Sequence, residues 1–215
     1  MKELRAEIEA EGGAAQVVSL DVTDYASIKS AIAHAETETG AIDILVNNSG
    51  VSASQRLVDV TPEDYAHMMD TNQRGAFFVA QEVAKRMITR YKGDPKKQHR
   101  IINIGSVAGL RVVPELGLYC ISKAAVVHMT KAMALEWGKF GINVNAICPG
   151  YIGTEINSDY FQSEQGQQVL EMLPRKRIGK PEDLDGLLLL LAAEESHFIL
   201  SLIHISEPTR QEAIS

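Results

Sequence analysis

The sequence predicts an α/β fold, a doubly wound parallel β-sheet in a single domain. Short apolar runs rich in Ile, Val and Leu alternate with longer segments whose apolar residues recur at helical spacing. Of the 215 residues, 45% are hydrophobic and 23% are charged, which is typical of one globular unit with a substantial core. Polar and glycine residues follow the apolar runs, where sheets of this type bind ligands.

Local signals define the elements of the first half. Residues 2–11 predict a helix ended by two glycines, and residues 16–20 predict a strand. Thr23 can cap the next helix, which runs to about residue 39. Continuous Ile, Leu and Val around residues 42–46 predict a central parallel strand that is buried on both faces.

Two long helices and two further strands dominate the second half. Thr61-Pro62-Glu63 places proline in a first helical turn and a carboxylate near the positive end of the dipole, and this helix is expected to reach about residue 90. Residues 100–104 and 143–147 predict strands, and residues 116–139 predict the second long helix. A last helix is expected from Lys180 through Leu191.

Charge and cysteine content exclude several classes of function. The formal net charge is -7, and no cluster of Lys and Arg forms a basic face, so binding to nucleic acid or to an anionic membrane is not expected. Cys120 and Cys148 lie far apart and lack the spacing of a zinc site or a disulfide framework, so no metal is expected. The same cysteine usage favours a reducing, cytoplasmic location. The apolar run at residues 187–191 is too short to span a bilayer.

Three polar side chains are expected to converge at the carboxyl edge of the sheet. Tyr119 and Lys123 are four residues apart on a helix and therefore share one face. Ser106 follows the preceding strand, where the chain turns back toward the same edge. Each feature alone is more typical of a loop or a solvated helix surface. Together they suit the reduction of a carbonyl group or its reverse.

The chemistry of these side chains supports this interpretation. An ammonium at Lys123 favours the tyrosinate, which makes Tyr119 a better proton-transfer group near neutral pH. The Ser106 hydroxyl can donate a hydrogen bond to a carbonyl oxygen. No amino-acid side chain supplies hydride, so a bound nicotinamide is required.

Two of the motifs are specific when they occur together. Asn47-Asn48-Ser49-Gly50 follows a predicted strand, and Ser106 stands thirteen residues before Tyr119-Cys-Ile-Ser-Lys123. In this order and spacing the sequence resembles the short-chain dehydrogenase/reductases of the single-domain type, close in pattern to 3-oxoacyl-carrier-protein reductases. The resemblance covers roughly residues 2–198.

Further matches to the family lie between and around these motifs. Asn72 resembles the helix asparagine that supports a proton relay to the lysine. Pro149-Gly150 and Thr154 resemble the segment that packs on the nicotinamide, and Asp21-Val22 resembles the pair that meets the adenine ring. The cofactor-binding residues that the resemblance implies are Asp21, Val22, Asn48, Ser49, Gly50, Tyr119, Lys123, Pro149, Gly150, Ile152 and Thr154.

The resemblance also implies an activity. It implies a Rossmann-like domain that uses NAD or NADP to interconvert a secondary alcohol and a ketone on a small-molecule substrate. Ser106 would position the substrate, and Tyr119 would exchange the proton. Lys123 would lower the pKa of Tyr119 and hold the ribose, and Asn72 would complete the relay. The two long helices would form a homodimer or homotetramer.

Both ends of the chain depart from the family. The family's first βαβ unit, with its Thr-Gly-x-x-x-Gly-x-Gly turn, has no counterpart after Met1. The domain over residues 1–199 is therefore expected to be incomplete, and the 215-residue chain is expected to bind cofactor poorly. Residues 200–215 resemble a translated sequencing adapter and are expected to be a non-native tail.

Other functions stay open at this point. A non-catalytic binding or scaffold protein could keep the fold after losing the cofactor turn, although the retained Ser, Tyr, Lys and Asn argue against it. An epimerase or dehydratase could use the same Tyr and Lys with a tightly held cofactor. The segment at residues 157–174 suits a mobile substrate lid and an ordinary pair of surface helices equally well.

Overall fold

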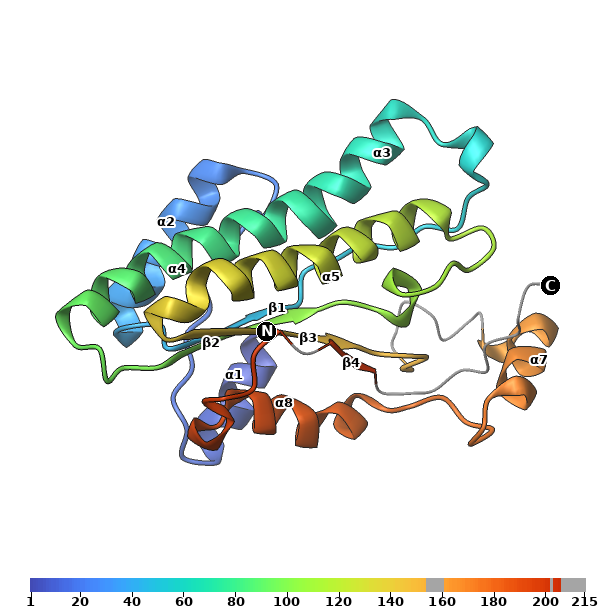
Figure 1. Ribbon diagram of the computed structural model, residues 1–215. Helices are drawn as coiled ribbons and strands as arrows, with labels where there is room; N and C mark the ends of the chain where they lie inside the picture. The colour runs from blue at the N-terminus through green and yellow to red at the C-terminus, as the bar shows by residue number, and fades with distance from the viewer. Residues whose placement is uncertain (154–160, 202, 206–215) are drawn as a thin grey trace.

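The computed structural model describes residues 1–153, 161–201 and 203–205, which form a single α/β domain with three layers (Figure 1). The sheet has four strands in the order β1-β2-β3-β4, and every pairing is parallel. The strands are β1 (Ile44–Asn47), β2 (His99–Ile104), β3 (Ile142–Cys148) and β4 (Ile203–Ile205). The prediction of a doubly wound parallel sheet is confirmed.

Helices cover both faces of this sheet. The α-helices are α1 (Lys2–Ala10), α2 (Tyr25–Thr39), α3 (Pro62–Met69), α4 (Ala76–Gly93), α5 (Gly117–Trp137), α7 (Glu164–Met172) and α8 (Asp185–Ala192). Figure 1 shows α2, α4 and α5 above the sheet and α8 below it. No helix among the described residues is long and apolar enough to cross a membrane.

Each face of the sheet has its own core. The larger one joins α2, α4 and α5 to the sheet through residues such as Ile28, Met87 and Ile101, none of which is more than 1% exposed. The smaller one packs Leu191 of α8 against Ile102 and Ile147. All seven residues of β3 are buried, because the strand has neighbours on both edges and helices on both faces.

Both long helices begin where the sequence predicts. Thr61 caps α3 in a reciprocal capping box with Asp64, and Pro62 occupies the first turn. The first long helix is not continuous, because the π-helical segment η2 (Asp70–Gly75) separates α3 from α4. Segments of this kind occur often at functional sites. The prediction missed it because hydrophobic spacing does not distinguish one widened turn from a regular helix.

Three predictions for the first half are wrong. Residues 16–20 form no strand, because a strand needs a hydrogen-bonded neighbour and β1 pairs only with β2 in the described sheet. The strand predicted at residues 42–46 is β1, but it lies at the sheet edge, with Ile44 45% and Val46 41% exposed. Helix α2 is capped by Asp24 rather than by Thr23, whose hydroxyl donates to Asp21 instead.

The last described strand lies where no element was expected. Residues 203–205 form β4, which pairs in parallel with β3 and places Ile203 opposite Ala146. The segment at residues 157–174 is described only from residue 161 onward, and it contains α7. Residues 154–160 lie outside the described residues, so the lid and the pair of surface helices both remain predictions.

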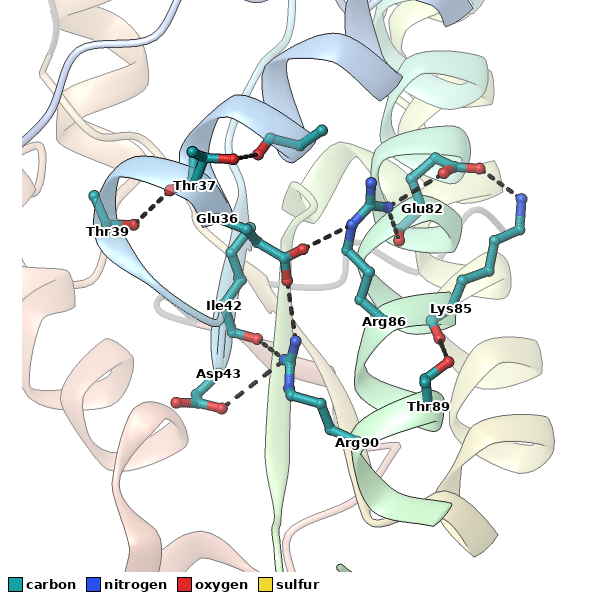
Figure 2. A network of polar contacts seen from close by, with 12 residues as sticks. Glu36, Thr37, Thr39, Ile42, Asp43, Glu82, Lys85, Arg86, Thr89 and Arg90 are labelled. Atoms are coloured by element: carbon teal, nitrogen blue, oxygen red, sulfur yellow. Dashed lines mark hydrogen bonds and ion pairs between the residues drawn. The ribbon is translucent and has the colours of Figure 1, made fainter. Parts of the chain in front are cut away.

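A network of ion pairs and hydrogen bonds connects α2 to α4 (Figure 2). The Glu36 carboxylate accepts from Arg86 Nε at 2.9 Å and from Arg90 Nη1 at 3.0 Å. Glu82 is 4% exposed and accepts from the Tyr25 hydroxyl at 2.7 Å and from Lys85 Nζ at 2.5 Å. Burial would raise the pKa of Glu82, but these donors outweigh it and lower the pKa to about 2.

Candidate active site

Ser106 and Tyr119 meet at the carboxyl edge of the sheet, as predicted. Ser106 follows β2 and caps the short helix η3 (Val107–Gly109), which packs against α5. The approach is close enough that a Cβ on Gly109 would stand 2.7 Å from the carbonyl carbon of Lys123. The Ser106 side chain lies near the Tyr119 hydroxyl and acts to lower its pKa. The packing of η3 on α5 therefore brings the two hydroxyls together from separate elements.

Lys123 lies beneath this pair and is almost completely buried. Its side chain is on the same helix as Tyr119, the residue is 6% exposed, and Nζ stands 5.8 Å from the Tyr119 ring centroid. Within the described residues, Nζ donates a hydrogen bond to the Ile104 carbonyl at 2.9 Å. Burial lowers the pKa of Lys123 to about 8, against the smaller effect of Cys148. An ammonium has three donors, so this arrangement leaves protons for a ligand.

The expected effect of Lys123 on Tyr119 is wrong in this structure. The pKa of Tyr119 is raised, because burial of the phenol outweighs the lowering effect of the Ser106 side chain. The Lys123 ammonium is directed to the Ile104 carbonyl and does not reverse this effect. Tyr119 is therefore a protonated phenol at neutral pH, which suits it to donate a proton.

Asn72 joins the site from the π-helical segment. It is 1% exposed, its Oδ1 accepts from the Val51 backbone N–H at 2.7 Å, and its Nδ2 donates to the Val51 carbonyl at 2.8 Å. These bonds fix the end of the 47–51 turn. A Cβ on Gly50 would stand 3.3 Å from Asn72 Oδ1 and 3.5 Å from Lys123 Nζ, so this turn approaches the lysine with no side chain between them.

The remaining predicted cofactor residues are distributed around this centre. The Pro149 carbonyl accepts from the Val107 backbone at 3.0 Å, which ties the end of β3 to the Ser106 segment. Ile152 forms a parallel bridge with Gly179. Asn48 and Ser49 are exposed on the turn, and Gly150 is half-buried. Thr154 lies outside the described residues.

Val22 packs against the π-helical segment that carries Asn72, and Asp21 precedes it in the chain. The Asp21 carboxylate accepts from the Thr23 backbone at 2.8 Å and from its hydroxyl at 2.7 Å. A Cβ on Gly75 would stand 2.8 Å from the Val22 carbonyl oxygen, so Val22 packs directly on the end of that segment. The structure thus places Val22 against the element that carries Asn72.

Two buried residues of the site were missed by the sequence analysis. Ser122 is fully buried and hydrogen-bonds both Asn72 and the Tyr119 carbonyl. Cys148 ends β3 beside Lys123, and burial raises the pKa of its thiol. Ser122 stands three residues after Tyr119 on the same helix, and this spacing is the signal that could have identified it.

Comparison with known proteins supports one family. Residues 1–205 match the family model described as enoyl-(acyl carrier protein) reductase. The galactitol 2-dehydrogenase of Agrobacterium fabrum is 37% identical over 200 residues, which cover 88% of this chain and 76% of that protein. The sorbitol dehydrogenase of Cereibacter sphaeroides is 38% identical over 200 residues, with the same coverage of 88% and 76%.

A solved structure agrees with these relatives. The crystal structure of a gluconate 5-dehydrogenase from Burkholderia cenocepacia in complex with NADP and tartrate superimposes with a TM-score of 0.87 at 34% identity, over 94% of this chain and 78% of that one. The chain belongs to the short-chain dehydrogenase/reductase family and is an NAD(P)-dependent oxidoreductase that interconverts a secondary alcohol and a ketone.

Proposed function

We propose that Tyr119 exchanges the proton in this reaction, while Ser106 orients the substrate oxygen and Lys123 and Asn72 support both. The observation that carries this assignment is the proximity of the Ser106 and Tyr119 side chains, brought together by the packing of η3 on α5, beside a buried lysine. Two hydroxyls that meet at one point can both reach a single substrate oxygen.

The residues present fit a nicotinamide dinucleotide. Lys123 keeps donor capacity beyond its bond to Ile104, and Gly50 leaves the approach to Lys123 Nζ free of a side chain. We propose that Lys123 and Tyr119 contact the ribose, that the turn at Asn48, Ser49 and Gly50 flanks it, and that the remaining contacts come from five other residues. These are Asp21, Val22, Pro149, Gly150 and Ile152, with Thr154 proposed from sequence alone. The bound nicotinamide supplies or accepts hydride.

The protein's own part in carbonyl reduction follows from the protonation states. The Ser106 hydroxyl donates to the substrate oxygen and holds it beside Tyr119. Tyr119 is protonated at neutral pH, as an ordinary phenol is, and its raised pKa keeps it so; it donates its proton to the oxygen as negative charge develops there. Lys123 provides a buried ammonium beside Tyr119. Asn72 holds the turn at Gly50 and Val51 next to that ammonium through its two bonds with Val51. In the reverse direction Tyr119 must first lose its proton.

The substrate is proposed from the relatives. Proteins named galactitol 2-dehydrogenase, sorbitol dehydrogenase and gluconate 5-dehydrogenase are among them, so we place small polyols and sugar acids first, ahead of acyl thioester substrates. We also propose a homodimer or homotetramer through α4 and α5, which is supported by the exposed Leu135 and Ile121 on α5. A cytoplasmic location is proposed from the free thiols of Cys120 and Cys148.

Turnover of the reduced nicotinamide, followed by its absorbance, tests the assignment on the protein expressed from its native gene. Tyr119→Phe removes only the hydroxyl and is expected to lower kcat by roughly 10²-fold to 10⁴-fold. Tyr65→Phe removes an exposed hydroxyl on α3 and is expected to leave turnover unchanged. Near-normal turnover of Tyr119→Phe would show that Tyr119 does not exchange the proton.

A further inference from the structure

We infer that Ser122 is a positioning residue that couples the π-helical segment to the Tyr119 and Lys123 face of α5, and so holds the turn at Gly50 and Val51 over the lysine. This inference rests on the proposed function. It assigns to Ser122 no contact with substrate or cofactor.

The Ser122 hydroxyl is buried, and it both donates and accepts a hydrogen bond. The residue is fully buried, and its Oγ donates to the Tyr119 carbonyl at 2.8 Å. The same oxygen accepts from Asn72 Nδ2 at 3.0 Å. The buried Ser122 hydroxyl therefore hydrogen-bonds the backbone of Tyr119, the proposed proton donor, and the side chain of Asn72.

Asn72 transmits this contact to the turn. With Nδ2 held by Ser122, the amide plane of Asn72 presents Oδ1 to the Val51 N–H at 2.7 Å and its second proton to the Val51 carbonyl at 2.8 Å. Gly50 precedes Val51 and is the residue whose Cβ would stand 3.5 Å from Lys123 Nζ. The hydrogen bonds of Ser122, Asn72 and Val51 therefore run from α5 through the π-helical segment to the turn, and Gly50 in that turn lies close to Lys123 on α5.

Deletion of the Ser122 hydroxyl removes its two hydrogen bonds, one to the Tyr119 carbonyl and one from Asn72. The Tyr119 carbonyl keeps its bond within the helix, because an α-helical carbonyl accepts from the residue four positions later. Asn72 instead loses a buried acceptor, and the nearest other one for that proton is the weakly accepting Met68 sulfur at 3.2 Å. The amide is then free to turn, and the Val51 bonds weaken with it.

Thr130 provides a matched control on the same helix. It is also fully buried, its Oγ1 donates to the Val126 carbonyl at 2.9 Å, and the same oxygen accepts from Asn103 Nδ2 at 2.9 Å. Ser122→Ala and Thr130→Val each delete one such hydroxyl. Thr130 lies seven residues beyond Lys123 and has no contact with Asn72 or Val51 among the described bonds. Its partner Asn103 accepts from Asn47 Nδ2 at 2.9 Å, so this network reaches the last residue of β1, where the turn begins, and not Gly50 or Val51.

Two readouts separate positioning from simple loss of stability. Steady-state kinetics of Ser122→Ala should show kcat lowered by about 10-fold to 10²-fold with KM little changed, because a displacement of about 1 Å is enough for such a loss. In the direction of carbonyl reduction, the alkaline limb of its pH profile should move to higher pH, since water that reaches Lys123 relieves the burial that lowers its pKa. Thr130→Val should change neither quantity.

Hydrogen–deuterium exchange gives a readout that needs no turnover. Ser122→Ala should speed exchange in the peptide that contains the Val51 amide, because Asn72 no longer protects it, whereas Thr130→Val should not. If Ser122→Ala does not fold, Ser122→Cys carries the same comparison with a weakly bonding thiol in place of the hydroxyl.

The outcomes distinguish this inference from the proposed function. Loss of turnover in Tyr119→Phe together with kinetics and exchange for Ser122→Ala that match Thr130→Val would overturn the role of Ser122 alone. Normal turnover in Tyr119→Phe would overturn the proposed function, and the exchange experiment would then still decide whether Ser122 holds the turn.

Discussion

Replacement of Gly109 by alanine tests whether the contact between η3 and α5 sets the reaction geometry. A Cβ at this position would stand 2.7 Å from both the carbonyl carbon and the carbonyl oxygen of Lys123, and 3.0 Å from the Ala124 nitrogen. Carbon atoms in good contact lie about 3.5–4.0 Å apart, so η3 and α5 must separate by roughly 1 Å. All of these atoms belong to the helix backbone, which cannot rotate away as a flexible side chain could.

The separation moves Ser106 relative to Tyr119, because Ser106 caps η3 and Tyr119 lies on α5. Misplacement by about 1 Å costs roughly 10²-fold in rate. Overpacking of this kind costs about 1–3 kcal/mol of stability. We therefore expect Gly109→Ala to lose turnover by about that factor and to melt at a lower temperature than the wild type.

Gly186→Ala is the control for this variant. Gly186 lies in α8, and a Cβ there would meet nothing within 4 Å. Gly186 is the second residue of α8, where the gain in helix propensity is smaller than the about 1 kcal/mol of a helix interior, so we expect an unchanged or slightly higher melting temperature and unchanged turnover. Turnover and melting of Gly109→Ala equal to those of the wild type would refute the argument that η3 is held at contact distance from α5.

Three further predictions follow from buried charges and from the Tyr119 pKa. Because the folded-state pKa of Glu82 is lowered from 4.5 to about 2, its stabilisation is fully present above pH 4.5 and is lost progressively as pH falls from 4.5 to about 2. Glu82→Gln should therefore cost about 2–3 kcal/mol at neutral pH and progressively less across that acid range, measured by urea denaturation. A penalty that does not depend on pH would contradict this. Arg100 is 4% exposed and donates to Ser196 Oγ at 3.2 Å and to the Ala193 carbonyl at 3.3 Å. Arg100→Met should therefore lower the free energy of unfolding by roughly 3 kcal/mol. An unchanged denaturation midpoint would count against this prediction. Alcohol oxidation should accelerate from about pH 7 to about pH 10, because Tyr119 must lose its proton and its pKa is raised; a flat profile at saturating alcohol would exclude Tyr119 as the base.

The starts of α3 and α5 were predictable from the sequence because their signals are local, whereas the cap of α2 and the interruption at η2 were not. The capping box of Thr61 and Asp64 involves residues three positions apart, and the proline in the first turn acts on its own backbone. The spacing of Tyr119 and Lys123 fixed them on one face of α5 for the same reason. Ser106 was placed correctly because a parallel strand delivers its last residue to the carboxyl edge of the sheet.

Burial could not be predicted in the same way. The apolar runs at β1 and β3 look alike in sequence, yet β3 is buried throughout and β1 has Ile44 and Val46 exposed. The difference is the number of neighbours each strand has, which is a property of the sheet. The segment at residues 16–20 has the composition of a strand but lacks a pairing partner, so it forms none.

The sequence by itself determined the fold class, the starts of α3 and α5, and the identity of Ser106, Tyr119, Lys123 and Asn72 as polar groups near the sheet edge. Tertiary structure decided how those groups behave. The raised pKa of Tyr119 depends on burial by residues distant in the chain, and the contact from Ser122 to Asn72 spans 50 positions. Local propensity acts over a few residues, whereas desolvation and buried hydrogen bonds depend on which distant segments pack together.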